Sequence, residues 1–429
     1  MNCRKFMLMT AAVFTAAVLF ADTFYWKGTS GVPGRWNALS NWSTEGATGA
    51  DADRLPGASD VVNSPLGNFS YATFLLSDDV AVGGFRGYYR YFVFRRDPAA
   101  SDGRVTVSVP GVFNETAYQH FVVDSGVDVR LVAGSTFHLA GSDAGRGSVT
   151  VNEGGRFLVQ GAVDGRHYDF NVNAGGELEF APTSYVKLSD PNNANMTDRF
   201  TVRGGTLSLP QGLSLQSGTA GRTNLITVTS GGTVCLGGNV SCSPMRYRLG
   251  LTDSVLSVTD DAVLTEGVDV VLSGTSAVDV ASGRRLALGS LVVSDGASLV
   301  KRGGGTLALD RDLPASVVLQ AGKLEVNVPD AVLAGRVEGD GPVAVVLGAK
   351  GFVYAAEGPA TVAFSLADNV FRTGDVVLTS ARADILAKAQ ADLASVGRNA
   401  SVEGSSLRLV PHETDAEGRP VGFAVHFLW

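Results

Sequence analysis

A short unit, a glycine turn followed by an alternating apolar strand, recurs along the middle of the chain and limits the folds that it can adopt. Nine such units follow one another at spacings of 21, 21, 29, 27, 21, 21, 22 and 26 residues. Self-similarity at this period is typical of repeat proteins, in which each unit packs on its neighbours. The units start at Gly134, Gly155, Gly176, Gly205, Gly232, Asp253, Gly274, Gly296 and Gly322.

The apolar residues of each unit recur at every second position, as at Leu207 and Leu209. This period indicates a strand with one buried face. The strands are short and rich in Val, Leu and Thr, and we find no sustained helical stripe between Gly134 and Gly322. The Leu-Asn pattern of leucine-rich repeats is also missing. We therefore predict an all-β chain whose residues 105–328 form a parallel β-helix, or β-solenoid.

Glycine suits the corners of such a coil because it adopts positive φ without steric cost. The longer spacings before Gly205 and Gly232 predict loops at a corner, one of them the polar, turn-rich segment 189–199. Insertions on one side of a solenoid are where a binding face can form. A ligand contact is therefore one hypothesis for this loop.

Residues 1–21 have the layout of a secretory signal peptide. Arg4 and Lys5 precede an apolar run over 6–20, and Ala21 offers a small residue before the cut. The run is shorter than the ~20 apolar residues of a membrane-spanning helix. Cleavage after Ala17 and an uncleaved anchor are the alternatives. We expect the protein to be secreted or held at the cell surface.

The mature chain is acidic, because removal of the predicted signal peptide changes the formal net charge from −8 to −10. An acidic chain with scattered arginines argues against a nucleic-acid partner. No second long apolar segment follows, so we expect no membrane span after signal cleavage. Cys235 and Cys242 then remain. An exported pair can form a disulfide, but Cys235 can equally be a small core residue of a strand.

The segment 296–326 reads "GASLVKRGGGTLALDRDLPASVVLQAGKLEV". Its two halves, "KRGGGTLAL" and "GKLEV", resemble the passenger-associated repeat of bacterial autotransporters. In that repeat a Lys, a short Gly run and a Thr-Leu-x-Leu strand precede a Gly-x-Leu-x-Val strand. The polar middle of the repeat is replaced here by "RDLPAS". The matching positions are Lys301, Gly303, Gly305, Thr306, Leu307 and Leu309, then Gly322, Leu324 and Val326.

A second stretch, "WKGTSGVPGRWNALSNW" followed by "LPGASDVV", resembles the start of large exported repeat proteins of Gram-negative and related bacteria. Together the two resemblances imply a right-handed parallel β-helix exported to the cell surface or beyond. The chain has only about 100 residues after Val326, too few for the translocating β-barrel of an autotransporter. The second resemblance depends on Trp26, Trp36, Trp42, Pro56, Gly57 and Asp60.

The two ends are predicted to cap the solenoid, because its exposed strand edges must be covered. The aromatic segment 22–104 is the N-terminal cap. Residues 329–429 hold the final coils and a small C-terminal α/β cap. Its one helix, over 383–396, has an apolar stripe of Ile385, Leu386, Ala389 and Leu393. A hairpin follows from Ser406, and the last residues form a closing strand.

The segment 85–97, "FRGYYRYFVFRRD", is the leading ligand-binding hypothesis. An aromatic face with interleaved arginines can stack on sugar rings. The alternative is a cap strand with both faces packed. As a strand it places Arg86, Tyr88, Arg90, Phe92, Phe94 and Arg96 on one side, and Tyr89, Tyr91 and Val93 on the other. Tyr88, Arg90, Phe92 and Phe94 are the predicted ligand-binding residues.

No catalytic or metal-binding constellation emerges, and we expect no cofactor. The five histidines are scattered singly, without the spacing of a zinc site. The compact triplet Asp310, Arg311 and Asp312 is the one candidate for the paired acids of a sugar-cleaving enzyme. We expect a non-enzymatic structural or adhesive surface protein whose partners are surface glycans or another surface protein. The alternative is a polysaccharide lyase or glycosidase on the same fold.

Overall fold

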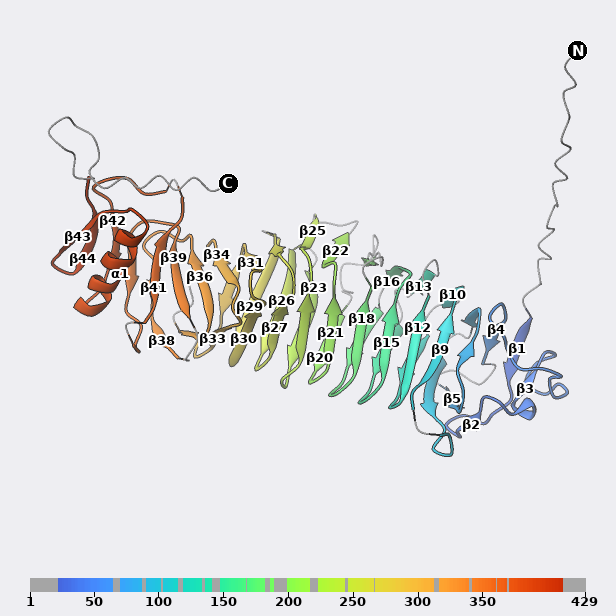
Figure 1. The fold of residues 1–429 in the computed structure, drawn as a ribbon. Helices are drawn as coiled ribbons and strands as arrows, with labels where there is room; N and C mark the ends of the chain where they lie inside the picture. The colour runs from blue at the N-terminus through green and yellow to red at the C-terminus, as the bar shows by residue number, and fades with distance from the viewer. Residues whose placement is uncertain are drawn as a thin grey trace, which may run out of the picture.

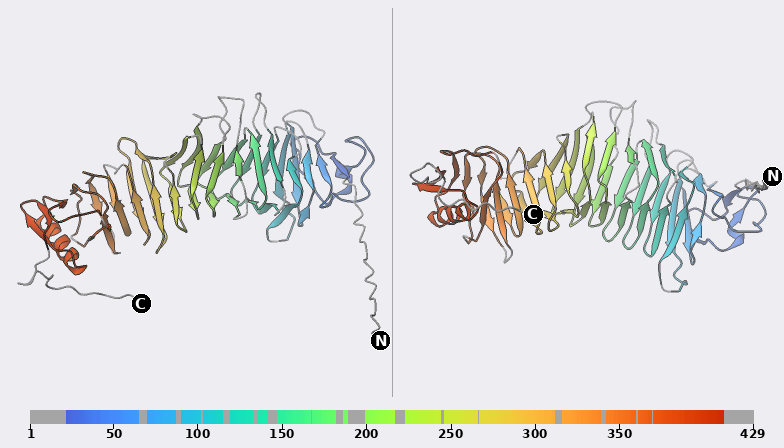
Figure 2. Two further views of the ribbon diagram at one scale, coloured as in Figure 1. Left: turned by 90° about the horizontal axis from the view of Figure 1, so that it is seen from above. Right: turned by 45° about the horizontal axis from the view of Figure 1, so that its top comes forward.

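The chain folds into an elongated β-solenoid of about 11 turns, shown by a computed structural model (Figures 1 and 2). The predicted signal peptide, the corner loop over 189–198 and Tyr88 lie outside the described residues. The structure describes residues 22–411 apart from 65–69, 87–89, 102, 115–118, 133–135, 141–146, 167, 182–185, 189–198, 217–222, 244–245, 266, 312–315, 339–341, 360 and 369.

Four sheets form the three walls of the solenoid, and most turns contribute one strand to each wall. Sheet I has 11 strands in the order β2 (Gly34–Arg35), β5 (Ser70–Leu76), β8 (Arg90–Arg96), β11 (His120–Val123), β14 (Gly147–Val151), β17 (Tyr168–Val172), β20 (Arg199–Arg203), β23 (Thr223–Thr229), β26 (Arg246–Thr252), β29 (Val268–Ser273) and β32 (Leu291–Val293).

Sheet II forms the second wall and has 12 strands. From the C-terminal end they are β38 (Gly335–Val337), β35 (Val317–Leu319), β33 (Ser298–Arg302), β30 (Thr275–Val280), β27 (Val255–Val258), β24 (Thr233–Leu236), β21 (Thr206–Leu209), β18 (Glu177–Phe180), β15 (Arg156–Val159), β12 (Val127–Leu131), β9 (Val105–Val109) and β6 (Val80–Ala81).

The third wall consists of two 8-stranded sheets, one for each half of the solenoid. Sheet IIIa contains β19 (Val186–Leu188), β16 (Ala162–Arg166), β13 (Thr136–Ala140), β10 (Val112–Asn114), β7 (Gly84–Arg86), β4 (Val61–Asn63), β1 (Thr23–Trp26) and β3 (Trp42–Ser43). Sheet IIIb contains β22 (Leu213–Gln216), β25 (Val240–Ser243), β28 (Ala262–Leu264), β31 (Arg285–Leu288), β34 (Thr306–Leu309), β36 (Gly322–Val326), β39 (Val343–Leu347) and β41 (Ala363–Leu366).

The core is a set of inward rows in which each turn places an apolar side chain directly on that of the previous turn. In sheet I, Phe92 is in register with Phe121, and Phe170 with Phe200. The rings of Phe170 and Phe200 stack with centroids 4.8 Å apart, and both are buried. The alternation in the sequence therefore reflects burial of every second residue, and the predicted β-solenoid is confirmed.

In the four turns that lead into β15, β18, β21 and β24, a pair of glycines makes the corner before sheet II. Gly154 has a φ of 68°, which side chains other than glycine rarely adopt. Glycine is needed at position 155 for a different reason. A Cβ there would lie 2.5 Å from the Val123 carbonyl oxygen of the previous turn. The first glycine allows the turn and the second allows neighbouring turns to approach closely.

Replacement of Gly176 by alanine is expected to lower the free energy of unfolding by about 1–3 kcal/mol. The new Cβ would meet the Val151 carbonyl oxygen at 2.6 Å, and backbone cannot move aside cheaply. Gly250→Ala is the matched control, because the nearest atom there, the Ile226 carbonyl oxygen, is 3.7 Å away. Denaturant unfolding of both variants tests this, and equal losses would contradict the close-approach explanation.

The repeat register inferred from the sequence needs one correction. Seven of the nine glycine-turn units lead into sheet II, from β15 to β33. The unit at Gly134 instead leads into β13 of sheet IIIa, and Gly322 begins β36 of sheet IIIb. A recurrence of about one turn length cannot distinguish the three walls, because strands of all three walls alternate apolar and polar residues.

The predicted boundary between cap and solenoid at residues 104 and 105 was also wrong. β5 pairs in parallel with β8 over seven residues, and β8 continues into β11. β4 pairs in parallel with both β1 and β7. The parallel stack therefore reaches back to β1, about 80 residues before the predicted start at residue 105. Aromatic residues that were assigned to a cap are in fact the core of its first turns.

The true N-terminal cap is a cluster of three tryptophans that closes the first turn. Trp26, Trp36 and Trp42 are buried, and β1 pairs with β3 antiparallel at Trp26 and Trp42. The centroid of the Trp42 ring lies 5.0 Å from Trp26 and 4.8 Å from Trp36. Phe74 of β5 contacts the same cluster. Antiparallel pairing and bulky rings thus end the parallel stack.

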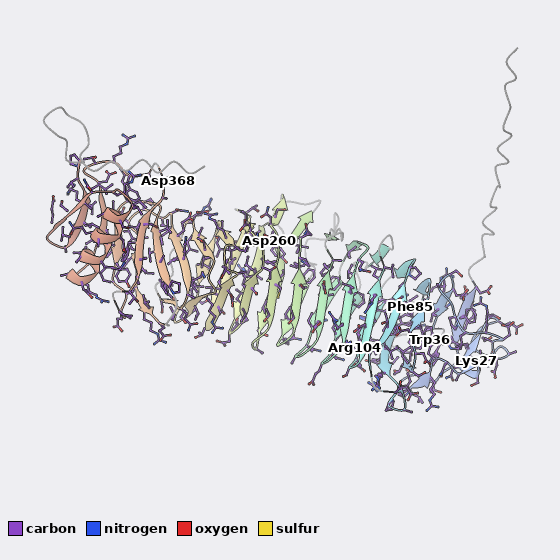
Figure 3. The ribbon with its side chains drawn as sticks, in the orientation of Figure 1. Lys27, Trp36, Phe85, Arg104, Asp260 and Asp368 are labelled. Carbon is purple, nitrogen blue, oxygen red and sulfur yellow. The ribbon has the colours of Figure 1, made fainter. Side chains whose placement is uncertain are left out.

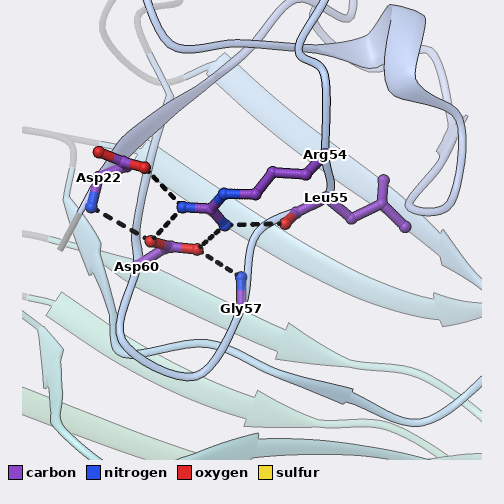
Figure 4. Close-up of polar contacts among 5 residues, drawn as sticks. All are labelled: Asp22, Arg54, Leu55, Gly57 and Asp60. Carbon is purple, nitrogen blue, oxygen red and sulfur yellow. Dashed lines mark hydrogen bonds and ion pairs between the residues drawn. The ribbon is translucent and has the colours of Figure 1, made fainter. Parts of the chain in front are cut away.

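Asp60, in the Pro-Gly-x-x-Asp part of the opening motif, joins this cap to the solenoid (Figure 4). Its buried carboxylate accepts hydrogen bonds from both terminal nitrogens of Arg54, at 2.5 and 3.0 Å, and from the Gly57 N–H at 2.6 Å. Arg54 also pairs with Asp22 at 2.5 Å. Burial opposes ionisation, but these hydrogen bonds hold the pKa of Asp60 below its ordinary value.

Lys301, the lysine of the repeat resemblance, is buried at an inward position of β33. Its amine donates hydrogen bonds to the carbonyl oxygens of Arg302, Gly303 and Ala321, the last two at 2.8 and 3.1 Å. Burial lowers the pKa of Lys301 to about 8, and Asp279 opposes the shift. The lysine therefore ties a glycine turn to the next turn of the coil.

The C-terminal cap contains the predicted helix, α1 (Ala383–Ser395), which buries the four residues of the predicted stripe. The parallel stack ends in a 5-stranded sheet of β37 (Val332–Leu333), β40 (Phe352–Tyr354), β42 (Val376–Thr379), β44 (Ser406–Leu409) and β43 (Ala400–Glu403). β44 pairs antiparallel with β42 and with β43. The hairpin partner thus precedes Ser406, and the predicted closing strand lies outside the described residues.

None of the helices in the described parts of the chain has the length and apolar character needed to cross a bilayer.

Candidate functional site

The outer face of sheet I near the N-terminal end carries an aromatic row. Tyr71 of β5 is in register with Tyr91 of β8, which is in register with His120 of β11. His120 is in turn opposite Ser148 of β14. The three rings come from three successive turns, so the parallel ladder itself brings together residues that lie far apart in the sequence.

The rings of this aromatic row are stacked. The ring centroids of Tyr71 and Tyr91 are 4.4 Å apart, with planes inclined by 20°. Those of Tyr91 and His120 are 4.2 Å apart and inclined by 12°. His120 Nδ1 lies 2.9 Å from Ser148 Oγ, which fixes the imidazole ring. The row is therefore a preorganised column that ends in a hydrogen-bonded hydroxyl.

Tyr71 is the open end of the column, with 43% of its surface exposed. The adjacent strand β2 pairs with β5 only at Phe74 and Leu75, so it places no strand residue beside Tyr71. A turn of small residues lies there instead, with the Gly31 N–H donating to the Tyr71 carbonyl at 3.1 Å. A Cβ at Gly31 would meet nothing within 4 Å. One face of the Tyr71 ring stacks on Tyr91, and the residue keeps 43% of its surface exposed.

Tyr91 and His120 are uncharged at neutral pH. Burial lowers the pKa of His120 to about 4, so the imidazole is neutral above that value. Burial and the neighbouring Tyr71 raise the pKa of Tyr91 above its ordinary value. A neutral, half-buried aromatic surface with hydroxyl groups at its edge suits a neutral polar ligand better than an ion.

A second outward row of sheet I, four residues further along the strands, is polar. Arg95 Nε and an Arg95 terminal nitrogen contact Asp124 Oδ2 at 2.9 and 2.8 Å. The Asn152 amide donates to Asp124 Oδ1 at 2.7 Å, and the Asn173 amide donates to Asn152 Oδ1 at 2.8 Å. Successive turns thus present a guanidinium, a carboxylate and two amides in one hydrogen-bonded line, which we call the polar row.

The aromatic and polar rows run side by side along the solenoid axis. Arg95 lies four positions after Tyr91, which is about 13 Å along an extended strand. The strip between the rows holds Thr73, Val93 and Val122. Thr73 and Val93 are each only 6% exposed, so the strip is largely closed to solvent and the two rows are the parts that a ligand can reach.

The predicted ligand-binding residues lie largely on the opposite face. Phe92 and Phe94 are fully buried in the core and cannot contact a ligand, so this prediction was wrong. The alternation was right, but the two faces of β8 were exchanged. Phenylalanine has no polar group to satisfy, whereas Tyr91 can keep its hydroxyl in water, and this difference was the available signal.

Arg90 is half-buried at the start of β8, and its Nε donates to the Ser64 carbonyl oxygen at 3.2 Å. Burial lowers its pKa from the ordinary value. This arginine therefore joins two turns of the solenoid. Tyr88, the remaining predicted residue, lies outside the described part of the chain.

Of the two alternatives for Cys235, a disulfide with Cys242 or a small residue of a strand, the structure shows the second, since Cys235 is a free cysteine. Cys235 lies on β24 of sheet II, whereas the backbone of Cys242 lies on β25 of sheet IIIb. The side chain of Cys242 is outside the description. Partial burial raises the pKa of the Cys235 thiol, which disfavours a reactive thiolate at neutral pH.

The predicted acidic triplet is partly described, since Asp312 lies outside the described residues. Asn327 Nδ2 donates to Asp310 Oδ1 at 2.8 Å and to Glu325 Oε1 at 3.0 Å, so two carboxylates meet at one amide. Glu325 also forms a two-pronged pair with Arg285 at 2.7 and 3.2 Å. The hydrogen bond from Arg285 lowers the pKa of Glu325, which favours a permanent anion rather than a proton donor.

The described residues contain no group of three or more His, Cys, Asp or Glu side chains that could hold a metal ion. No family model, curated protein or solved structure matches the chain. The class that the fold defines is the β-solenoid.

Proposed function

We propose that the protein is an exported, non-enzymatic β-solenoid that acts as a structural or adhesive surface protein and contacts glycans through the outer face of sheet I. The observation that carries the proposal is the stacked column of Tyr71, Tyr91 and His120 beside the polar row. The signal-peptide layout of residues 1–21 and the resemblance to autotransporter passengers support export to the cell surface or beyond.

The chemistry of the two rows matches that of a neutral sugar chain. The C–H face of a pyranose packs on an aromatic ring, and the open side of Tyr71 offers such a ring. Sugar hydroxyls both donate and accept hydrogen bonds, and the carboxylate and amides of the polar row provide the complementary groups. Because the rows follow the solenoid axis, an extended polysaccharide can contact several turns at once.

Binding of the full mature chain to a glycan array, together with a polysaccharide-degradation screen, tests the proposal. We expect retention on one or more neutral glycans without release of new reducing ends. Time-dependent release of such ends would instead support a lyase or glycosidase. Absence of retention on every glycan would contradict the glycan contact.

Tyr71→Ala is expected to weaken glycan binding about tenfold, because loss of one aromatic stacking contact costs about 1–1.5 kcal/mol. Val292→Ala is the matched control, since Val292 is 48% exposed on the last strand of the same sheet, far from the column. The ratio of dissociation constants on the retained glycan is the readout. Equal affinities of the two variants would show that Tyr71 does not contact the glycan.

A further inference from the structure

A cavity of about 280 Å³ lies where the N-terminal cap meets the first turn of the solenoid. Its walls are the chain around Trp36 and Asn37, the loop with Leu55 and Pro56, and the corner over 77–81 that follows β5. Trp36 is labelled near this end of the solenoid in Figure 3. Tyr71 is near the start of β5 and the cavity is at its other end, so this site is distinct from the aromatic row.

The cavity lining combines apolar residues with a chain of hydrogen bonds. Trp36, Leu55 and Pro56 supply apolar surface. In the same lining, the Asn37 amide donates to Ser77 Oγ at 3.0 Å, and the Ser77 hydroxyl donates to Asp78 Oδ2 at 2.7 Å. A cavity with an apolar wall and a few fixed polar groups is the usual form of a small-molecule site.

The indole nitrogen of Trp36 has no acceptor among the described residues. Trp36 is only 2% exposed, and its backbone carbonyl accepts from Trp42 Nε1 at 2.7 Å. Trp26 Nε1 is completely buried and lacks a hydrogen-bond partner in the described part of the chain. Trp36 Nε1 also lacks a partner among the described residues, but it is not completely buried and keeps access to solvent. Trp36 is also one of the residues that line the cavity.

The charge of the cavity selects the ligand. Asp78 and Asp79 line it, and none of its described lining residues is basic. Asp79 Oδ1 is already occupied by the Thr106 N–H at 2.7 Å, whereas Asp78 extends the hydrogen-bond chain. Carboxylates attract hydroxyl donors and repel anions. The volume is slightly below the range of about 300–1,000 Å³ typical of sites for drug-sized ligands.

We infer that this cavity binds a single neutral pyranose, with one sugar face on the Trp36 and Leu55 side and its hydroxyls on Asn37, Ser77 and Asp78. The Trp36 indole N–H donates to a ring or hydroxyl oxygen. The inference does not require the outer face of sheet I to bind glycans, because the two sites lie at opposite ends of β5.

Titration of the full mature protein with glucose, galactose, mannose and N-acetylglucosamine tests the inference, with glucuronic acid as the anionic control. Trp36 is part of the buried cap, so the cavity is blocked instead by Ala58→Phe, at an exposed lining position. Indole fluorescence and calorimetry report binding. We expect at least one neutral sugar to bind, glucuronic acid to bind at least tenfold more weakly, and Ala58→Phe to abolish binding.

Two further variants separate this site from the aromatic row. Asp78→Ala removes an acceptor at an exposed position and is expected to weaken binding of the sugar at least fivefold. Tyr71→Ala is expected to leave the affinity of the cavity for the sugar unchanged. Absence of binding by all four neutral sugars would overturn the inference, as would equal binding to Ala58→Phe. Loss of binding in Tyr71→Ala alone would also overturn it and would assign the sugar to the outer face.

Discussion

Trp42→Ala is expected to lower the free energy of unfolding of the N-terminal turns by about 3–5 kcal/mol. Trp42 is fully buried between Trp26 and Trp36, and its indole N–H satisfies the Trp36 carbonyl. Removal of the ring leaves a cavity in the cap and an unpaired acceptor. Because neighbouring turns stabilise one another, hydrogen exchange is expected to rise first in β1, β4 and β5.

Hydrogen exchange resolved by segment, together with denaturant unfolding, measures this effect. Tyr71→Ala provides the matched control, since it removes a half-exposed aromatic ring from β5, the strand whose Phe74 contacts the tryptophan cluster. Tyr71→Ala is expected to lower the free energy of unfolding by less than half as much as Trp42→Ala does. An exchange pattern of Trp42→Ala that matches the control would mean that the tryptophan cluster does not cap the solenoid.

Acidification is expected to destabilise the same region through His120. The folded pKa of about 4 lies below the ordinary value of 6.5, so the folded state binds fewer protons than the unfolded state in that interval. The contribution of His120 is fully present above about pH 6.5, declines as the pH falls, and is lost near pH 4. The difference between the two pKa values corresponds to a loss of at most about 3 kcal/mol in the free energy of unfolding.

Unfolding free energies at about pH 7.5 and pH 4.5 measure this contribution, with His120→Phe as the comparison because phenylalanine keeps a ring beside Tyr91 and does not titrate. The wild-type protein is expected to lose more stability than the variant. The pKa of Asp60 is also lowered, so its own contribution is lost only at still lower pH, in both proteins. Identical pH dependence would show that His120 is not buried as described.

The sequence predicted what depends on short-range periodicity. Two-residue alternation identified the strands, and the stripe of Ile385, Leu386, Ala389 and Leu393 identified α1 with its buried face. The start of the solenoid was misplaced because β4, β5 and β8 carry no glycine pair at the corner spacing of the later turns. Their aromatic residues suggested a cap, although Phe74, Phe92 and Phe94 are core residues of regular turns.

The candidate surface was harder to predict, because it depends on the register between turns. Tyr71, Tyr91 and His120 are separated by 20 and 29 residues, and only the parallel pairing aligns them. The polar row has the same origin, since Arg95, Asp124 and Asn152 come from three turns of unequal length. The cavity at Trp36 depends on contacts between loops, for which the sequence carries no periodic signal.

The comparison of Tyr91→Ala with Phe92→Ala tests the central claim most directly, because these neighbours lie on opposite faces of β8. Binding of the full mature chain to the retained glycan and its unfolding free energy are measured for both variants. We predict that Tyr91→Ala remains folded and loses most glycan binding, whereas Phe92→Ala loses about 3–5 kcal/mol of stability. A folded Tyr91→Ala protein that binds the glycan as tightly as the wild type would contradict the proposed surface.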